Sequence, residues 1–199
     1  MLKIGVMLRV TPPVPMSWID QRPDDAMAGA FDAIGPTPIA SVEPARFRDA
    51  MSRLGAAVHV ITTTGAAGHA GVTATAVCSV SDQPPTLLVC LNRKSYACSV
   101  LGEAGVLCVN VLRADAEATA DAFAGRGGLT MEERFATTSW TTLATGAPVL
   151  ENAVVSFDCR VVEVKSVATH NVFFAVVEGV RVGAPGPALL YHERGYKQV

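Results

Sequence analysis

Short runs of β-branched and apolar residues, separated by brief turns, fill the chain from residue 57 onward, and this alternation limits the fold more than any other feature. Strands are predicted at 57–64, 71–80, 86–92, 106–112, 153–167, 171–182 and 189–191. Regular helical crossovers, which parallel strands require, are missing from this pattern. We therefore predict a mainly β protein with a few helices, in which an antiparallel sheet forms a barrel.

Few segments carry a helical pattern. Apolar residues recur at helical spacing from Phe47 to Leu54, and Pro44 precedes them in a position suited to a first helical turn. Further short helices are expected at 95–101, 115–124 and 131–135.

Residues 1–42 differ from the rest, because they hold six of the 12 prolines and no sustained hydrophobic period. We expect this Pro-rich stretch to be an N-terminal extension that is partly disordered or drapes over a neighbour. A single domain is then predicted for residues 43–199.

The composition excludes several classes of protein. The formal net charge is −2, so no basic stripe can neutralise phosphates and no nucleic-acid partner is expected. No apolar run reaches the roughly 18 residues of a membrane span, and the first residues lack the pattern of a secretory signal. The five cysteines have no CxxC spacing, which is typical of free thiols in a reducing compartment and predicts no metal site. Together these features predict a cytoplasmic protein without a membrane partner.

Most catalytic motifs are missing from the sequence: it has no GxGxxG after a strand, no GxxxxGK[ST], no GxSxG and no HExxH. Hydroxyl groups at strand ends remain. Thr73 and Thr75 lie two residues apart on one face of a predicted strand. The small residues Ala74 and Ala76 would let a flat or phosphorylated ligand approach the backbone closely, and Ser79 follows at the strand end.

A second polar cluster follows the buried strand at 86–92. The stretch NRKS at 92–95 supplies an amide, two cations and the start of a helix that Ser95 can cap. Free N–H groups at a helix N-terminus attract anions, so this stretch suits an anionic ligand group.

The segment from Phe47 to Tyr196 resembles the short-chain flavin reductases, the small reductase partners of two-component flavin-dependent monooxygenases. The resemblance covers about three-quarters of the chain and lies in FRDAMSRLGAAVHVITT, GVTATAVCSVSDQPPTLLVCLNRKS, VLCVNVL, the FAG at 123–125, GAPVLENAVVSFDCRV and ATHNVFFAVVEGV. Within the family it is greatest to the flavin reductases of pyrimidine utilisation, on TATAVCSVSD and LTMEERF.

The resemblance implies an FMN-binding split barrel and a homodimer with two flavin sites near the subunit interface. It implies that the flavin contacts Thr73, Ala74, Thr75, Ala76, Ser79, Cys90, Leu91, Asn92, Ser95, Phe123 and Tyr196. Phe123, in the FAG motif, matches a residue that closes over the cofactor.

His170 matches the histidine of the family motif Gly-Asp-His-x-x-Phe, which lies on the nicotinamide side. Here the motif reads ATHNVF, so Ala168 and Thr169 stand where the family has Gly and Asp. Any role that depends on that carboxylate is therefore not available to this chain.

The implied activity is NAD(P)H-dependent reduction of FMN, with FAD or riboflavin as alternative flavins and NADH or NADPH as the donor. Hydride transfer is the chemistry of the two cofactors, so no catalytic side chain is predicted. Reduced flavin would then pass to a partner monooxygenase, in the closest subgroup a pyrimidine-degrading one.

Two other readings stay open at this point. The chain could be a split-barrel carrier or sensor that binds flavin or haem without turnover, and the altered residues before His170 favour this alternative. An oxidase acting on a pyridoxine phosphate would need a denser set of phosphate-binding cations than NRKS provides.

Overall fold

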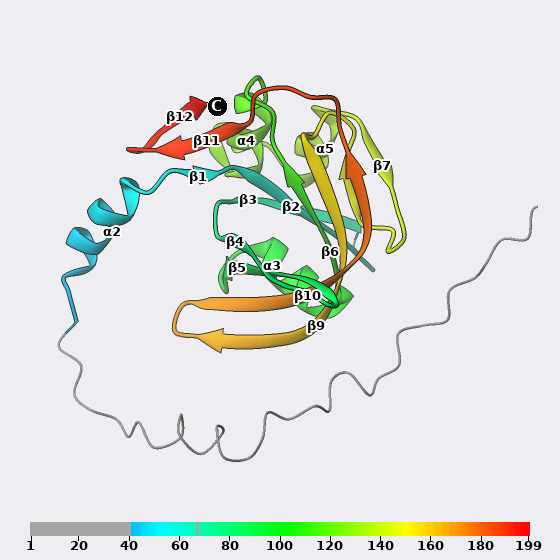
Figure 1. Ribbon diagram of the computed structural model, residues 1–199, viewed down its shortest axis with the longest axis horizontal. Helices are drawn as coiled ribbons and strands as arrows, with labels where there is room; N and C mark the ends of the chain where they lie inside the picture. Colours follow the sequence, from blue (N-terminus) through cyan, green and yellow to red (C-terminus); the bar gives the residue numbers. More distant parts are fainter. Residues whose placement is uncertain (1–40, 67) are drawn as a thin grey trace, which may run out of the picture. The chain divides into compact units, whose positions relative to one another are not determined.

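A computed structural model describes residues 41–66 and 68–199 of the chain. The predicted Pro-rich extension at 1–42 falls almost wholly outside these residues. Within them, seven strands pair antiparallel in the order β3-β2-β6-β9-β10-β5-β4 (Figure 1). Their bounds are β2 His59–Gly65, β3 Gly68–Ala74, β4 Val77–Asp82, β5 Pro85–Asn92, β6 Val106–Val111, β9 Val155–Val167 and β10 His170–Val182.

The two edge strands of this sheet, β3 and β4, follow one another in the sequence. The sheet must therefore curve until its edges come together, which is consistent with the predicted split barrel and confirms the mainly β, antiparallel fold class. One long strand was predicted at 71–80, but the chain turns at Thr75 and Ala76. The Val77 N–H donates to the Thr75 carbonyl at 3.0 Å, and this tight turn separates β3 from β4.

Two smaller sheets were not predicted as such. Strand β11 (Leu189–His192) pairs with β1 (Ala56–Ala57) and with β12 (Gly195–Gln198), so the strand predicted at 189–191 belongs to a separate three-stranded sheet. A two-residue turn at Glu193 and Arg194 lets β11 pair with β12. Both turn residues adopt left-handed backbone angles, φ 49° and 61°, which a tight hairpin of this kind requires. Strands β7 (Trp140–Thr142) and β8 (Pro148–Leu150) form the third sheet.

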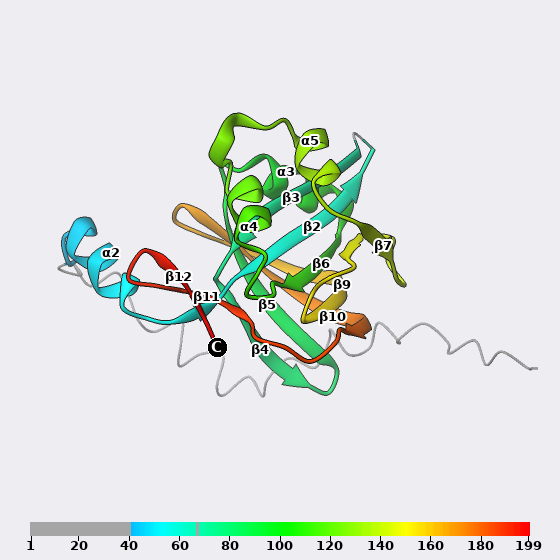
Figure 2. The same ribbon diagram turned by 90° about the horizontal axis from the view of Figure 1, so that it is seen from above.

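The predicted helices are present as α2 (Pro44–Ser52), α3 (Tyr96–Ala104), α4 (Glu117–Phe123) and α5 (Met131–Ala136). Helices α4 and α5 lie together against β3, as Figures 1 and 2 show. None of the described helices is long and apolar enough to cross a membrane. The apolar stripe on α2 is not buried in the chain, since Phe47, Met51 and Leu54 remain 58%, 47% and 59% exposed.

Two large apolar clusters form most of the core of the described residues, beside two smaller ones. One lies inside the main sheet beneath α3 and includes Ile61, Leu101 and Phe173. The other lies between the first strands, α4 and the β11–β12 hairpin, and includes Leu112, Phe123 and Leu189.

The side chain of Asn110 links four strands in the interior. Its Nδ2 donates to the Val60 carbonyl at 3.1 Å, while its Oδ1 accepts from the Leu150 N–H at 2.8 Å and from Ser156 Oγ at 2.9 Å. Because Asn110 is fully buried on β6, these bonds fix the register of β2, β8 and β9 around it.

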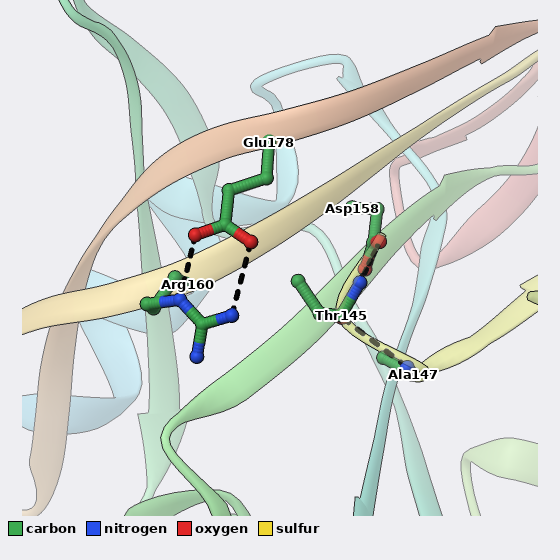
Figure 3. Close-up of polar contacts among 5 residues, drawn as sticks. All are labelled: Thr145, Ala147, Asp158, Arg160 and Glu178. Atoms are coloured by element: carbon green, nitrogen blue, oxygen red, sulfur yellow. Dashed lines mark hydrogen bonds and ion pairs between the residues drawn. The ribbon is translucent and has the colours of Figure 1, made fainter. Parts of the chain in front are cut away.

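A buried carboxylate holds the loop between β7 and β8 (Figure 3). Asp158 on β9 is 0% exposed and accepts from the Thr145 N–H at 2.7 Å and from the Thr145 hydroxyl. That hydroxyl oxygen in turn accepts from the Ala147 N–H at 3.2 Å. The neighbouring pair of Arg160 and Glu178 lies at the surface and is joined by two bonds of 2.6 and 3.0 Å.

Candidate functional site

The pairing of β5 with β10 brings several of the predicted site residues onto one face. His170 lies directly opposite Asn92, and Val172 lies directly opposite Cys90. Residues directly opposite each other in a sheet project to the same side, so these four share one face. The intervening pair, Leu91 and Asn171, projects to the other side, where Leu91 is buried in the core beneath α3.

The turn at Thr75 and Ala76 borders the same face, which we call the outer face. The Ala76 carbonyl accepts from the Cys90 N–H at 3.0 Å, which continues the β4–β5 register and places Ala76 opposite Cys90. Ala76 is exposed while Cys90 and Val172 are half-buried, so small and apolar groups form a shallow floor there.

The β9–β10 turn stands at the end of the outer face and is held by Arg93. The Arg93 N–H donates to the Thr169 carbonyl at 3.0 Å, and its guanidinium donates to the Ala168 carbonyl at 3.3 Å. Ala168 adopts φ 47°, a left-handed angle that a glycine would adopt without strain. Next to it, Oγ1 of Thr169 lies 2.9 Å from Nδ1 of His170.

In the stretch 92–95, which was predicted to suit an anionic ligand group, the side-chain oxygens accept hydrogen bonds from backbone N–H groups of the chain itself. Oδ1 of Asn92 accepts from the Lys94 N–H at 2.9 Å. Oγ of Ser95 accepts from the Cys98 N–H at 3.2 Å, which confirms Ser95 as the N-cap of α3. The Asn92 amide nitrogen and the exposed Lys94 ammonium are then the groups that can face a ligand.

A second group of predicted site residues surrounds α4 instead of the outer face. The Thr73 hydroxyl donates to the Ala120 carbonyl at 2.6 Å, and the Tyr196 hydroxyl donates to Asp121 at 2.8 Å. Phe123 is 1% exposed and packs edge-on against Phe135 and Trp140. Burial and the Asp121 bond raise the pKa of Tyr196 to about 12, so its hydroxyl stays protonated.

The remaining predicted positions belong to neither group. Thr75 and Ser79 are exposed, and the Ala74 carbonyl lies 3.2 Å from Nδ1 of His59. Sequence reasoning gave His59 no role at the site, yet it is buried directly beside the predicted flavin-binding strand. Burial lowers the pKa of His59, which keeps its ring neutral.

The thiol of Cys90 has a neighbour that spacing along the sequence could not indicate. Cys78 on β4 lies opposite Leu88 on β5, two residues from Cys90, so Cys78 and Cys90 project to the same face. Burial, together with nearby Cys78, raises the pKa of Cys90, so this thiol is not activated as a nucleophile.

Residues 51–199 match the family model described as flavin reductase like domain. The chain belongs to this flavin reductase family. The match includes both the outer face and the α4 group. It therefore confirms the resemblance that the sequence motifs carry.

Named relatives make the comparison more specific. "FMN reductase (NADH) RutF 1" of Methylorubrum extorquens (strain PA1) is 52% identical over 157 residues, which span 79% of this flavin reductase and 77% of the relative. "FMN reductase (NADH) RutF" of Agrobacterium fabrum is 52% identical over 151 residues, or 76% and 86% of the two chains.

Solved structures share the fold. BorF, the flavin reductase component of a bacterial two-component tryptophan halogenase, superposes with a TM-score of 0.73 at 27% identity over 79% of this chain and 98% of its own. A flavin reductase domain protein from Arthrobacter sp. FB24 gives a TM-score of 0.72 at 26% identity, covering 79% and 96%. This flavin reductase therefore shares its architecture with solved proteins that are themselves named as flavin reductases.

Proposed function

We propose that this chain catalyses the reduction of FMN by NADH, with the flavin ring lying on the outer face. The observation that carries the proposal is the β5–β10 register, which places Asn92 and His170 opposite one another on one face in a member of the flavin reductase family. The names of the relatives support NADH as donor and FMN as acceptor.

The residues of the outer face suit a flat ring with a polar edge. Ala76 projects only a methyl group, so a planar ligand can lie close to the backbone there, and Cys90 and Val172 offer half-buried apolar surface. The Asn92 amide nitrogen can donate to a ring carbonyl, because its oxygen is already engaged by Lys94.

Bound FMN supplies the hydride-accepting chemistry, and the chain supplies position and charge. Lys94 and Arg93 stabilise the negative charge that reduction places on the ligand. His170 orients the nicotinamide, and the outer face holds the donor against the flavin within the roughly 3–3.5 Å that transfer requires. No side chain has to move a proton for this step.

Transfer of reduced FMN to a partner monooxygenase follows as part of the proposal. The neighbour BorF is the reductase component of a two-component system, which supports a partner enzyme for this chain. A pyrimidine-degrading monooxygenase is the partner that the sequence resemblance implies. A homodimer in the cytoplasm is proposed as well, supported by the exposed apolar stripe on α2, which a second copy would cover.

Steady-state oxidation of NADH and NADPH with FMN, FAD and riboflavin tests the activity. We expect the highest kcat/KM with NADH and FMN. Ala76→Trp should raise the KM for FMN at least about tenfold by filling the floor of the site, whereas Ala184→Leu, on an exposed loop, should not change it. Flavin binding without NADH consumption would overturn the proposal in favour of a carrier or sensor.

A further inference from the structure

The turn residues before His170 depart from the family motif, and their contacts show what replaces the missing carboxylate. Thr169 occupies the aspartate position, and its Oγ1 lies 2.9 Å from Nδ1 of His170. This is a hydrogen bond between neighbouring side chains on the outer face. The bond restrains the imidazole of His170, which is exposed and would otherwise rotate freely.

We propose that Thr169 is a positioning residue for NADH: its hydroxyl donates to Nδ1 of His170 and holds the ring in the tautomer that presents Nε2–H to the carboxamide oxygen of the nicotinamide. The inference rests on the proposed function, because it assumes that His170 contacts the nicotinamide. It adds the group that decides which ring nitrogen carries the proton and where that nitrogen points.

The backbone around Thr169 is fixed well enough for its hydroxyl to act in this way. Both turn carbonyls, those of Ala168 and Thr169, are held by Arg93, which directly follows the adjacent strand β5. His170 itself lies in register with Asn92 on one side and Val167 on the other. The turn therefore has little freedom, and the Thr169 side chain has a defined direction.

The direction of this hydrogen bond depends on the tautomer of His170, and we assign the hydroxyl as the donor because that tautomer fits the nicotinamide. A threonine hydroxyl can donate or accept, whereas the unprotonated nitrogen of a neutral imidazole only accepts. Donation from Thr169 to Nδ1 uses the hydroxyl hydrogen and leaves Nε2 as the protonated nitrogen. A carboxamide oxygen needs a donor, so this tautomer is the one that fits the nicotinamide.

The same hairpin offers a matched control. The Ser166 hydroxyl donates to Oδ1 of Asn171 at 2.9 Å, and this pair projects to the opposite face, toward α3. Removing either hydroxyl deletes one side-chain hydrogen bond at the turn end of the β9–β10 hairpin. Only the Thr169 hydroxyl touches His170.

The first measurement is steady-state kinetics of Thr169→Val, Thr169→Ser, Ser166→Ala and His170→Ala. We expect Thr169→Val to raise the KM for NADH about 2- to 10-fold while the KM for FMN stays within about twofold of wild type. Thr169→Ser should restore the NADH value, and Ser166→Ala should match wild type. An unchanged NADH KM in Thr169→Val overturns the inference.

The second measurement does not depend on activity. Long-range ¹H–¹⁵N spectra of the ¹⁵N-labelled protein at about pH 8, where histidine is neutral, report the tautomer of His170. We expect Nε2–H in wild type and in Thr169→Ser, and a mixture of tautomers in Thr169→Val. Nδ1–H in wild type would overturn the inference.

The two failures can be told apart. If His170→Ala leaves the NADH KM unchanged, the nicotinamide contact itself is wrong, and the positioning role falls with it. If His170→Ala raises that KM but Thr169→Val does not, only the role of Thr169 is wrong.

Discussion

The ring of Phe123 occupies the space that a side chain at Gly71 would need. A Cβ placed on Gly71 would lie 2.6 Å from Cε1 of Phe123, well inside van der Waals contact. Phe123 is buried on α4, so it cannot swing away without opening the core. The glycine is therefore needed for the packing of β3 against α4, and the main contacts of Phe123 are with the protein interior.

Gly71→Ala should lower the free energy of unfolding by about 1–3 kcal/mol, because either β3 or the Phe123 ring must shift. Urea denaturation measures this change. Gly102→Ala is the control. Gly102 lies in α3, where an added Cβ would have no heavy atom within 4 Å apart from the backbone of its own helix. This substitution should raise the free energy of unfolding by about 0.5–1 kcal/mol. Equal effects at the two sites would contradict the packing argument.

His59 should make the protein less stable in acid. Its folded-state pKa lies below its ordinary value of 6.5 because burial disfavours the charged ring. As the pH falls through 6.5, the unfolded chain takes up a proton at His59 before the folded chain does, so the free energy of unfolding falls. The loss is about 1.4 kcal/mol for each unit by which the pKa is lowered, and it ends below the folded-state pKa.

Chemical denaturation between about pH 8 and pH 5 measures the slope of the free energy of unfolding against pH. His59→Gln keeps a donor for the Ala74 carbonyl but does not titrate, so the slope should become shallower. His69→Gln, at an exposed histidine, is the control for replacing an imidazole by an amide. If His59→Gln has the wild-type slope, the buried imidazole is not its source.

The two carboxylates in Figure 3 should differ strongly in their contribution to stability. Asp158→Asn should lower the free energy of unfolding by about 2 kcal/mol, since it weakens charge-assisted bonds to Thr145 in a fully buried site. Glu178→Gln should change it by no more than about 1 kcal/mol, because solvent screens its pair with Arg160. Thermal or urea unfolding of both variants decides the point, and a larger loss for Glu178→Gln would be the contrary result.

Thiol reactivity should distinguish two deeply buried cysteines from an exposed one. Burial raises the pKa of Cys159 to about 12 and also raises that of Cys108, so neither thiol should react with a disulfide reagent near pH 8 until the protein unfolds. Exposed Cys78 should react first. Mass spectrometry of the labelled protein identifies the sites, and early labelling of Cys108 or Cys159 would show that the core opens.

Cys90 has a structural role in this account, so Cys90→Ser should keep full NADH:FMN reductase activity. Its thiol is half-buried and its pKa is raised, which makes it a poor nucleophile. Initial rates of NADH oxidation measure the outcome. A loss of more than about tenfold in kcat, well beyond what a packing change gives, would point to a redox role for the Cys78 and Cys90 pair.

Local patterns along the chain were sufficient to predict most elements. The runs that became β6, β9 and β10 are rich in valine, and Ser95 marks the start of α3 by its own hydrogen bond. Such signals are local, because strand propensity and helix capping depend on residues close together in sequence. Motif order likewise indicated the family, which the match over residues 51–199 confirms.

Spatial neighbours had to come from the tertiary structure. The resemblance grouped Thr73, Phe123 and Tyr196 with Asn92 and His170, whereas the fold separates them into a set around α4 and a set on the outer face. The side of a sheet on which a residue lies depends on register, and a shift of one residue reverses it. The turn at Thr75 and Ala76 is an example, since it divides what the sequence pattern presents as one strand.

The sequence by itself determined that this chain makes an antiparallel β fold of the flavin reductase family, because alternation and turn residues act locally. Only the tertiary structure decided that His59 is buried beside Ala74, that Cys78 neighbours Cys90, and that Thr169 reaches the ring of His170. Each of these contacts depends on how strands distant in sequence align, or on the exact angle of a turn. Neither is encoded in the identity of the residues taken one at a time.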